Sequence, residues 1–454
     1  MADGTGWIYM DKTVAIKNKI LSLTERLPEG KRLPSARALA SDFGVSFQFV
    51  QRVVDDLSER GVIQVFPRSG MEPHPYWRSR IVNGVLRMHA DQKLALELSK
   101  KINQELPEIF VASKFDHAPM ELSVSHYLIS HHHNYCDLTQ LLDKTVPEKG
   151  MLFSKMLYSG RFGTELCGIP LFFSPKVMIL NRKLFAQHNV PLPPENWTWE
   201  EFEKTVCALG RKMEPFRAFG TWINGLTEWM NFVTVNGGCI FDSQNAEEVK
   251  IDAPETMEAL EFFHTLSRRA AVPEEHRKTY NHYEDFLAGN IAIYPGSRQT
   301  VSAMLLNGRF AKDDIVLRPM PVRETGMAPR SMLAANFFCV RRECVDMQLA
   351  KQLMELLLSD GCQRDIIGAS RCGIPIVQKA AQASFDGSDP HDAVFARTLF
   401  HVVPRYNITN PVSYQLINRC MNEALAGTQS EMKDMVKKLA DTLRMLVRFG
   451  VSEK

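Results

Sequence analysis

The sequence LPSARALASDFGVSFQFVQRVVDDLSERG, residues 33–61, decides the fold of the first part of the chain. Ser35 precedes apolar residues at helical spacing, so its hydroxyl can cap a short helix that ends at Gly44. Ser46 offers a second cap, and the helix after it carries one apolar stripe at Val50, Val53, Val54 and Leu57. Two short helices joined by a tight turn predict a helix-turn-helix.

The flanking sequence extends this unit on both sides. Upstream, Ile16, Ile20, Leu23 and Leu27 give another helix one apolar face, which can close a small core. Downstream, residues 62–66 have strand character and run into a turn at residues 67–70 with Arg68 near its tip. A strand, a basic turn and a second strand predict a wing.

The helical spacing places a polar surface opposite the apolar stripe of the third helix. In a helix-turn-helix this face enters the major groove, where Gln and Arg side chains pair with base edges. A helical bundle used only for assembly is the alternative interpretation. The residues expected on this face are Phe47, Gln48, Gln51, Arg52 and Asp55.

From Thr13 to Glu72 the sequence resembles the winged-helix domain of the GntR family of bacterial transcription regulators. The segment 33–40, with Gly44, Ser46, Leu57, Gly61 and residues 68–70, carries the resemblance. The resemblance implies that Arg37 and Arg68 meet the phosphates and the minor groove, while the third helix reads bases. The DNA-binding residues it implies are Ser35, Arg37, Ser46, Phe47, Gln48, Gln51, Arg52, Arg68 and Gly70.

The third helix departs from the family pattern at two positions. Many members carry Arg where this chain has Phe47 and Gln51. The loss of two cations weakens the electrostatic part of DNA binding. Two roles are open for Phe47: contact with a thymine methyl group, or packing in the domain's own core.

The composition is that of a soluble globular protein with several domains. Its 454 residues exceed one winged helix, and 45% hydrophobic and 23% charged residues are ordinary values. Residues 1–80 hold 12 Lys and Arg against 9 Asp and Glu, an excess compatible with DNA binding. Nine scattered cysteines, without a secretory signal or an apolar run long enough to span a bilayer, predict a cytoplasmic protein with reduced thiols.

After the wing the pattern changes. Residues 1–73 are predicted to form the DNA-binding domain, residues 74–80 a short stiff linker, and residues 81–454 a larger domain. Strand-like segments at 81–88, 109–112 and 122–124 alternate with a helix-like segment at 94–102. This alternation predicts an α/β fold with much of its sheet parallel.

Over residues 80–450 the sequence resembles extracellular solute-binding protein family 1, the sugar-binding proteins of bacterial uptake systems. The order and spacing of the segments 168–170, 180–185, 194–202, 236–238, 286–293, 319–321 and 373–375 carry the resemblance. The resemblance implies two α/β lobes of the periplasmic-binding-protein type 2, joined by a hinge and closing on a ligand between them. Because the sequence before Gly168 matches poorly, the first lobe is expected to be shortened or remodelled.

A sugar site combines flat aromatic faces with a few directed polar groups. Candidates of both kinds follow predicted strands or lie in loop-like segments, and core packing is the alternative for each tryptophan. Trp197 and Trp199 are expected in the core. The candidate ligand-binding residues are Asp116, Phe172, Phe173, Trp222, Glu228, Trp229, Tyr294, Ser297, Arg298, Asn336 and Arg371.

No catalytic, metal-binding or cofactor-binding motif is expected. The sequence lacks a nucleophile elbow, a phosphate loop, a zinc-protease motif and a dinucleotide fingerprint. The run His131–His133 lacks ligands at metal-binding spacing, so an exposed loop is expected there.

Together these features predict a bacterial transcription regulator whose operator binding is controlled by a carbohydrate, acting as a homodimer without cofactor, metal, enzyme activity or membrane partner. The alternative is a sugar receptor of a transport system that carries the winged helix as an assembly module.

Overall fold

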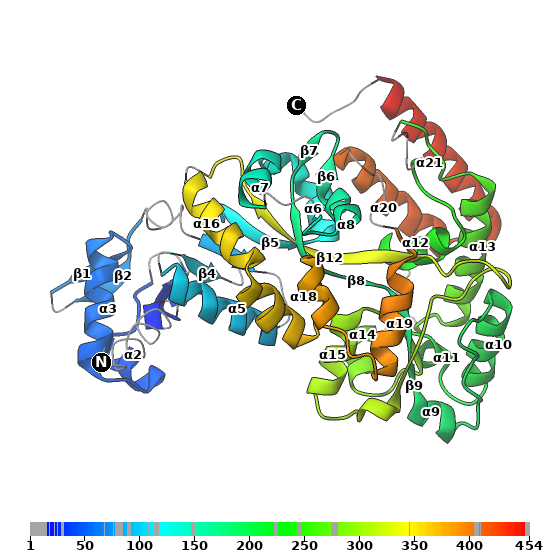
Figure 1. Ribbon diagram of the computed structural model, residues 1–454, viewed down its shortest axis with the longest axis horizontal. Helices are drawn as coiled ribbons and strands as arrows, with labels where there is room; N and C mark the ends of the chain where they lie inside the picture. The colour runs from blue at the N-terminus through cyan, green and yellow to red at the C-terminus, as the bar shows by residue number, and fades with distance from the viewer. Residues whose placement is uncertain are drawn as a thin grey trace.

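The computed structural model contains a small N-terminal unit at one end of a larger body (Figure 1). It describes residues 16–449 apart from 18, 22, 25, 29–30, 68, 76, 78–84, 89–91, 108, 113–117, 147–149, 222–225, 243–244, 246, 274–279, 345, 404–407 and 409. Three predicted site residues, Asp116, Trp222 and Arg68, lie outside the described residues.

The N-terminal unit is a winged helix-turn-helix, as the sequence predicts. The described positions between 16 and 26 are helical, and they are followed by α2 (Ala36–Phe43), α3 (Phe47–Glu59), β1 (Ile63–Phe66) and β2 (Gly70–Pro73). The two strands pair in an antiparallel hairpin, the wing. Apolar side chains from all these elements form one buried cluster, in which Ile20, Leu39, Val50 and Leu57 are fully enclosed.

The described part of the larger body contains two main sheets and a two-stranded hairpin. The strands of the larger sheet lie in the order β13-β8-β12-β5-β3-β4, and β14 pairs with β12 outside this path. Their bounds are β3 (Val85–Met88), β4 (Phe110–Ala112), β5 (Met120–Val124), β8 (Ile169–Pro175), β12 (Ser331–Val340), β13 (Ile374–Pro375) and β14 (Val402–Val403). The smaller sheet has the order β10-β9-β11, with β9 (Val177–Asn181), β10 (Ile293–Gly296) and β11 (Ile315–Arg318).

The expectation that much of the sheet is parallel holds for the strands from which it was made, β3, β4 and β5, but not for the rest of the two sheets. β3 pairs in parallel with β4 and β5, and β12 with β14, but the other described pairs in the two sheets are antiparallel. The chain leaves the larger sheet along β8 and returns along β12, so these two strands run in opposite directions. Antiparallel pairing at the centre follows from this exchange of the chain between the sheets.

The two sheets are joined at the β8–β9 crossing. Lys176 separates the two strands; its amide donates to the Met332 carbonyl at 3.1 Å, and its carbonyl accepts from Ser331 Oγ at 2.7 Å. Beyond the crossing, β9 is buried on both faces: Met178 and Leu180 join the main core, while Val177 and Ile179 join a second cluster. We call the larger sheet with its helices lobe 1, the smaller sheet with its helices lobe 2, and this crossing the junction.

Helices cover both sheets. Those of lobe 1 are α5 (Gln92–Glu105), α6 (Ser125–His131), α7 (Thr139–Thr145), α8 (Ser154–Leu157), α16 (Met347–Leu358), α17 (Asp360–Cys362), the π-helix η5 (Gln363–Gly368) and α18 (Gln378–Ala383). Those of lobe 2 are α9 (Arg182–Gln187), α10 (Trp199–Gly210), α11 (Pro215–Ala218), α12 (Leu226–Val235), α13 (Pro254–Arg269), α14 (His282–Leu287), α15 (Arg298–Leu306) and α19 (Pro390–Leu399). Smaller elements are the hairpin β6 (Arg161–Phe162) and β7 (Glu165–Leu166), and the 3₁₀ turns η2 (His132–Asn134), η3 (Tyr158–Gly160) and η4 (Lys312–Asp314).

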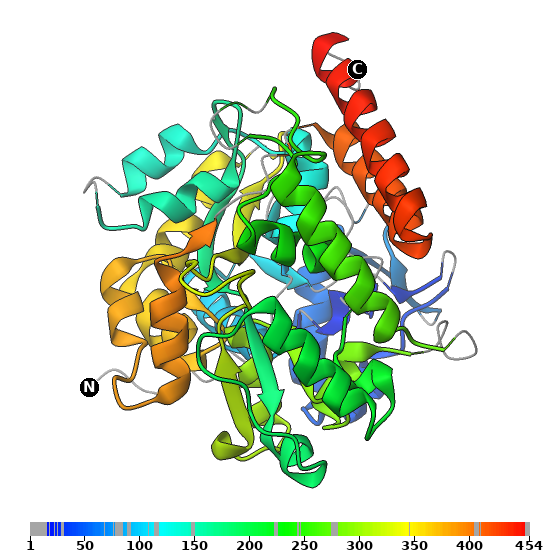
Figure 2. The same ribbon diagram turned by 90° about the vertical axis from the view of Figure 1, so that its right-hand side faces the viewer.

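The last two helices span the lobes. α20 (Pro411–Ala426) packs against α6 of lobe 1, while α21 (Gln429–Phe449) packs against α13 of lobe 2. Figure 2 shows the two helices side by side along one flank of the body. The pair connects the lobes away from the β8–β9 crossing.

Local predictions around α10 are confirmed. Thr198 and Glu201 form the predicted capping box at its start. Trp197 and Trp199 are buried in the core, and their indole nitrogens donate to the carbonyls of Pro319 and Pro321. The histidine run is not a loop: His131 ends α6, and His132 and His133 continue into η2, because the helix tightens into a 3₁₀ turn.

Candidate functional site

Helix α3 is positioned by two serine caps. Ser46 Oγ accepts a hydrogen bond from the Phe49 amide at 3.3 Å, and Ser35 Oγ accepts one from the Ala38 amide at 3.2 Å, at the start of α2. Between the helices Gly44 has φ 65°, a left-handed conformation that costs glycine nothing. The two caps and Gly44 together form the tight turn that sets the angle between α2 and α3.

The buried and exposed faces of α3 are divided as the sequence predicts. The buried stripe contains Phe49, Val50, Val53, Val54 and Leu57. On the opposite side Phe47, Gln48, Arg52 and Asp55 are exposed, and Gln51 is half-buried with its amide nitrogen 2.8 Å from Asp55 Oδ1. This face is free of the domain's own packing, and its contact with bases stays a prediction.

The structure excludes one of the two roles considered for Phe47. Its side chain is 43% exposed and lies outside the buried cluster of the winged helix. The Arg37 guanidinium lies 5.6 Å from the centre of its ring, within the range of a cation–π interaction. Phe47 therefore does not pack in the domain's core.

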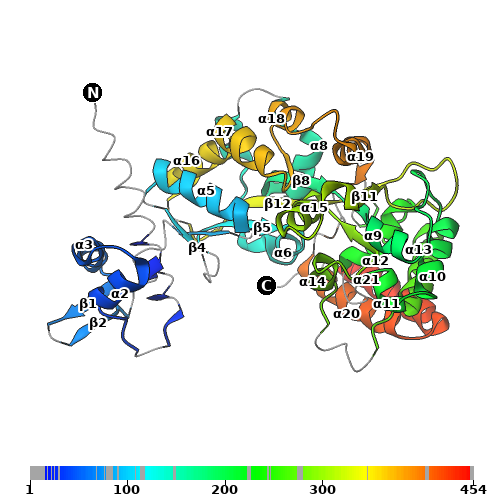
Figure 3. The ribbon, with the colours of Figure 1, turned by 90° about the horizontal axis from the view of Figure 1, so that it is seen from below.

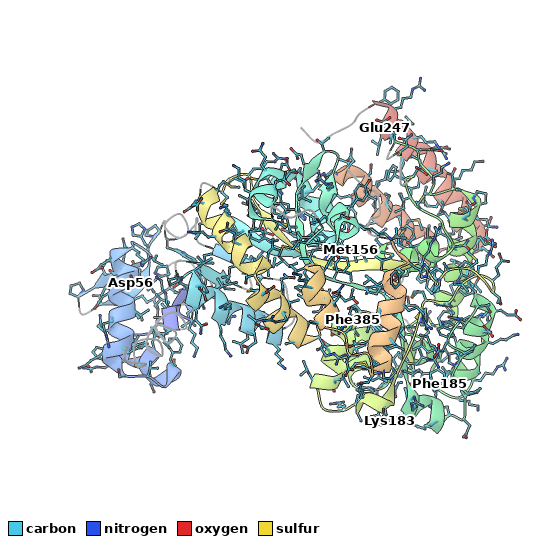
Figure 4. All side chains as sticks on the ribbon, viewed as in Figure 1. Asp56, Met156, Lys183, Phe185, Glu247 and Phe385 are labelled. Atoms are coloured by element: carbon cyan, nitrogen blue, oxygen red, sulfur yellow. The ribbon has the colours of Figure 1, made fainter. Side chains whose placement is uncertain are left out.

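An ion pair between Asp56 of α3 and Lys17 connects α3 to the first helical segment. Asp56, labelled in Figure 4, lies 3.0 Å from Lys17 Nζ and 2.9 Å from Arg60 Nε. Burial alone would raise the pKa of Asp56, but the hydrogen bonds from Arg60 and Lys17 hold it below its usual range. The carboxylate thus stays charged and ties α3 to its neighbour.

The wing is held against the start of α2. The Leu33 amide donates to the Met71 carbonyl at 2.9 Å, and the Arg32 guanidinium donates to the Ser69 carbonyl. Gly70 has φ 93°, so the predicted site residue has a conformational role at the turn. Val65 and Phe66 on β1 are exposed.

Three candidate ligand residues of lobe 1, Phe172, Phe173 and Asn336, lie on neighbouring strands next to the junction. Phe172 of β8 faces Asn336 of β12 on one side and Pro375 of β13 on the other. The register of β12 shifts between Asn336 and Phe337, an irregularity that redirects the strand at this point. Phe172, Phe173 and Asn336 are all buried, so packing alone explains the two aromatic side chains.

Arg298 lies between the lobes. It opens α15 of lobe 2, directly after the candidate Ser297, whose amide donates to Thr300 Oγ1 at 3.2 Å. The Arg298 amide donates to Ser174 Oγ at 2.9 Å, and its Nη1 donates to the Gly373 carbonyl at 3.2 Å; both acceptors belong to lobe 1. The Arg298 guanidinium lies 4.9 Å from the centre of the Phe385 ring, and Phe385 is labelled in Figure 4.

The guanidinium of Arg298 is almost fully used by protein acceptors. Nη2 donates to Asp392 Oδ1 at 2.9 Å and to the Ser384 carbonyl at 2.6 Å, whereas its buried Nε has no hydrogen-bond partner. Burial lowers the pKa of Arg298, against the effect of the adjacent Asp392 carboxylate. The unpaired Nε is the one nitrogen of this side chain left for a ligand.

Arg371 joins the same polar cluster from lobe 1. Its φ of 56° is rare for a residue with a side chain, and it places the guanidinium against Asp389 (2.7 Å) and Asp392. Lys312 of lobe 2 lies 3.0 Å from Asp389. We call Arg298, Lys312, Arg371, Asp389 and Asp392 the polar cluster. It ties the two lobes together by charge.

The candidates around α12 divide into two groups. Tyr294 is half-buried and stacks on Phe286 at 4.6 Å, and burial together with the charge of Glu228 raises the pKa of its phenol, which places Glu228 nearby. Trp229, by contrast, is 1% exposed within the main core. In this conformation Trp229 offers no ring face to a ligand, whereas Glu228 and Tyr294 form a candidate pair.

Sequence reasoning missed several polar groups that the fold brings to the same region. Asp389 and Asp392 of the polar cluster are separated from Arg298 by about ninety residues, so no local pattern indicates them. Thr221 Oγ1 and Asn231 Oδ1 are buried without a hydrogen-bond partner. Unpaired buried oxygens are costly, and both flank the Glu228 segment, so we add them to the ligand candidates.

Comparison with known proteins supports the predicted folds of the N-terminal unit and of the larger body. Residues 14–72 match the model of the bacterial regulatory proteins of the gntR family. No curated protein sequence matches the chain.

The larger body resembles solved structures of solute-binding proteins. The substrate-binding protein Lmo0181 from Listeria monocytogenes, in complex with cycloalternan, is 16% identical with a TM-score of 0.67, covering 80% of this chain and 98% of its own. A solute-binding protein from Thermotoga lettingae, bound to α-D-tagatose, is 14% identical with a TM-score of 0.68, covering 80% and 99%. UgpB from Mycobacterium tuberculosis, in complex with glycerophosphocholine, is 14% identical with a TM-score of 0.63, covering 80% and 98%.

The chain joins a gntR-family winged helix to a solute-binding-protein fold. Because nearly the whole length of each related structure is covered, the expected shortening of the first lobe is wrong. Within the part of the chain that the structure describes, no helix has the length and apolar character needed to cross a membrane.

Proposed function

We propose that this protein is a bacterial transcription regulator that binds operator DNA through α3 and the wing and responds to a small ligand held between its lobes. The single observation that carries the proposal is the presence of a gntR-family domain and a solute-binding fold in one chain. We further propose that it acts on DNA in the cytoplasm as a homodimer, since paired recognition helices match a two-fold operator.

A carbohydrate is the ligand class that we propose. Two of the similar proteins were solved with cycloalternan and α-D-tagatose, and residues around the junction combine aromatic rings with carboxylate, amide and guanidinium groups. The glycerophosphocholine complex of UgpB favours a second candidate class, a phosphodiester polyol. Of the sequence-predicted residues, Glu228, Tyr294, Asn336, Arg298 and Arg371 are the ones we propose for ligand contact.

A packed joint between the two parts supports ligand control of DNA binding. Trp77, which follows the wing, and Phe110 and Ala118 of lobe 1 belong to the same buried cluster as the winged-helix core. Figure 3 shows the N-terminal unit beside β4, the edge strand that begins with Phe110. A change in the angle between the lobes would thus be transmitted to the DNA-binding unit by these packing contacts.

The first test is a thermal-shift screen of the full chain against mono- and oligosaccharides and glycerophosphocholine. A ligand at a hundred times its dissociation constant stabilises the folded state by about 2.7 kcal/mol, which gives a measurable shift. Glu228→Gln should abolish the shift and Arg37→Ala should leave it intact. Trp229→Ala is unsuitable because it opens a cavity in the core.

The second test is titration of the ligand with and without operator. Coupling of about 1–3 kcal/mol is usual for allosteric proteins, and it must act in both directions. Operator DNA should therefore change ligand affinity by the same factor by which ligand changes operator affinity. Superimposable titrations would contradict ligand control while leaving DNA binding itself intact.

A further inference from the structure

We propose that Phe47 is a specificity-determining residue that reads the methyl group of one thymine in each operator half-site. The inference rests on the proposed DNA-binding function and adds the chemistry of base selection to it. It concerns a position where the chain departs from the basic residue that the family resemblance leads one to expect.

The position of Phe47 in the fold is the first part of the argument. It is the first residue of α3, directly after the cap Ser46. In helix-turn-helix proteins the N-terminal residues of the recognition helix contact base edges in the major groove. Phe47 is 43% exposed there, on the same face as Gln48 and Gln51.

The chemistry of the side chain is the second part. A phenyl ring can neither donate nor accept a conventional hydrogen bond from a base edge. In the major groove the thymine C5-methyl is the apolar group that distinguishes one base pair from the others. An exposed ring at this position therefore selects for thymine by burying its methyl group.

Arg37 restricts the ring and is the third part. Its guanidinium lies 5.6 Å from the ring centre and comes from the first turn of α2, so the pair connects the two helices of the motif. A cation held at this place faces the negatively charged backbone of a bound duplex. In this arrangement the Arg37 guanidinium can contact a phosphate while the Phe47 ring contacts the base. The contact between the two side chains restricts both before DNA binds, so less side-chain entropy is lost on binding.

The core offers no competing role. Phe49, two residues later, is 7% exposed and packs in the buried cluster, whereas Phe47 is absent from that cluster. The exposed Phe66 lies on β1 of the wing instead of α3 and supplies a matched control.

The experiment begins with selection of operator duplexes from a randomised pool by the full chain. Each thymine of the selected duplex is then replaced in turn by deoxyuridine, which removes only the methyl group. For the wild-type chain, loss of one buried methyl should weaken binding about fourfold at one position per half-site. Phe47→Ala should bind the thymine and deoxyuridine duplexes equally, while Phe66→Ala should keep the fourfold difference.

Two results would overturn the inference. One is a wild-type chain that binds every deoxyuridine duplex as tightly as the parent, and the other is a Phe47→Ala chain that keeps the methyl effect. In both cases specific operator binding persists and the proposed function stands. Failure to select any duplex would overturn the inference and the proposed function together. Thermal unfolding of Phe47→Ala checks its fold, and the wild-type deoxyuridine series needs no variant at all.

Discussion

At the scale of single residues, Asp392 is a buried carboxylate at the centre of the polar cluster. It is 2% exposed, and it accepts hydrogen bonds from Arg298, Arg371 and the Asp386 amide. Removing one partner of a buried ion pair costs about 3–5 kcal/mol, since the remaining charge has no counter-ion. We therefore expect Asp392→Ala to lower the free energy of unfolding by that amount in a urea titration. Glu200→Ala, which breaks the exposed pair with Lys204, is the control and should have little effect.

His282 should make stability depend on pH. Burial lowers its pKa to about 4, and the Asp285 carboxylate acts in the opposite direction. In the unfolded chain the pKa returns to about 6.5, so the unfolded state binds more protons between these two values. The free energy of unfolding should thus decrease as the pH falls from 6.5 to 4, by at most about 1.4 kcal/mol per pH unit from this residue.

The measurement compares urea titrations of wild type, His282→Gln and His133→Gln across that pH range. His282→Gln should show the shallower decrease, and His133→Gln, whose side chain is exposed, should follow wild type. Equal slopes for all three chains would rule out a neutral buried histidine at position 282.

Residue-level predictions succeeded where the cause is local. Ser35, Ser46 and Thr198 cap helices because a hydroxyl before an apolar series acts on amides two or three residues away. Arg298 was singled out at a strand exit, but its partner Asp392 could not be, since only the folded chain brings the two together. The prediction of a loop-like segment around Trp229 is wrong, because residues 226–235 form α12. Leu226, Trp229, Met230 and Val233 lie at helical spacing and are all buried, so Trp229 is part of the apolar stripe of this helix.

At the scale of elements, the stability of α3 should depend on its cap. Ser46→Ala removes the acceptor of the Phe49 amide, and loss of such a cap costs about 1 kcal/mol. Hydrogen exchange of the α3 amides should show this loss as faster exchange throughout the winged helix. Ser41→Ala, an exposed serine within α2, should leave the exchange unchanged or slow it, because alanine favours helix. Similar effects of the two substitutions would show that the Ser46 hydroxyl does not act as a cap.

Elements held together by residues close in sequence were predicted correctly, whereas the strand directions at the centre of the larger sheet were not. The apolar stripe of α3 and the hairpin β1–β2 depend on residues close in sequence, and both were predicted correctly. The direction of β12 between β5 and β8 depends on the chain passing through lobe 2 first, and an alternating pattern of strands and helices does not record that path.

At the scale of the whole molecule, the cluster of Trp77, Phe110 and Ala118 with the winged-helix core should carry the coupling between ligand and operator. We expect Phe110→Ala to leave ligand affinity and operator affinity, each measured alone, close to wild type. In allosteric proteins one bound partner usually changes the affinity for the other about 5- to 150-fold, or about 1–3 kcal/mol. In Phe110→Ala the factor by which the small ligand changes operator affinity should fall toward 1.

Isothermal titration of the ligand with and without operator measures that factor directly. Leu96→Ala is the control, because Leu96 is 55% exposed on α5 of the same lobe and should keep full coupling. If Phe110→Ala keeps full coupling as well, the packed joint does not transmit the signal. Coupling would then have to pass through other contacts, such as those of the proposed dimer, because a ligand can shift operator binding only through contacts that differ between the two states.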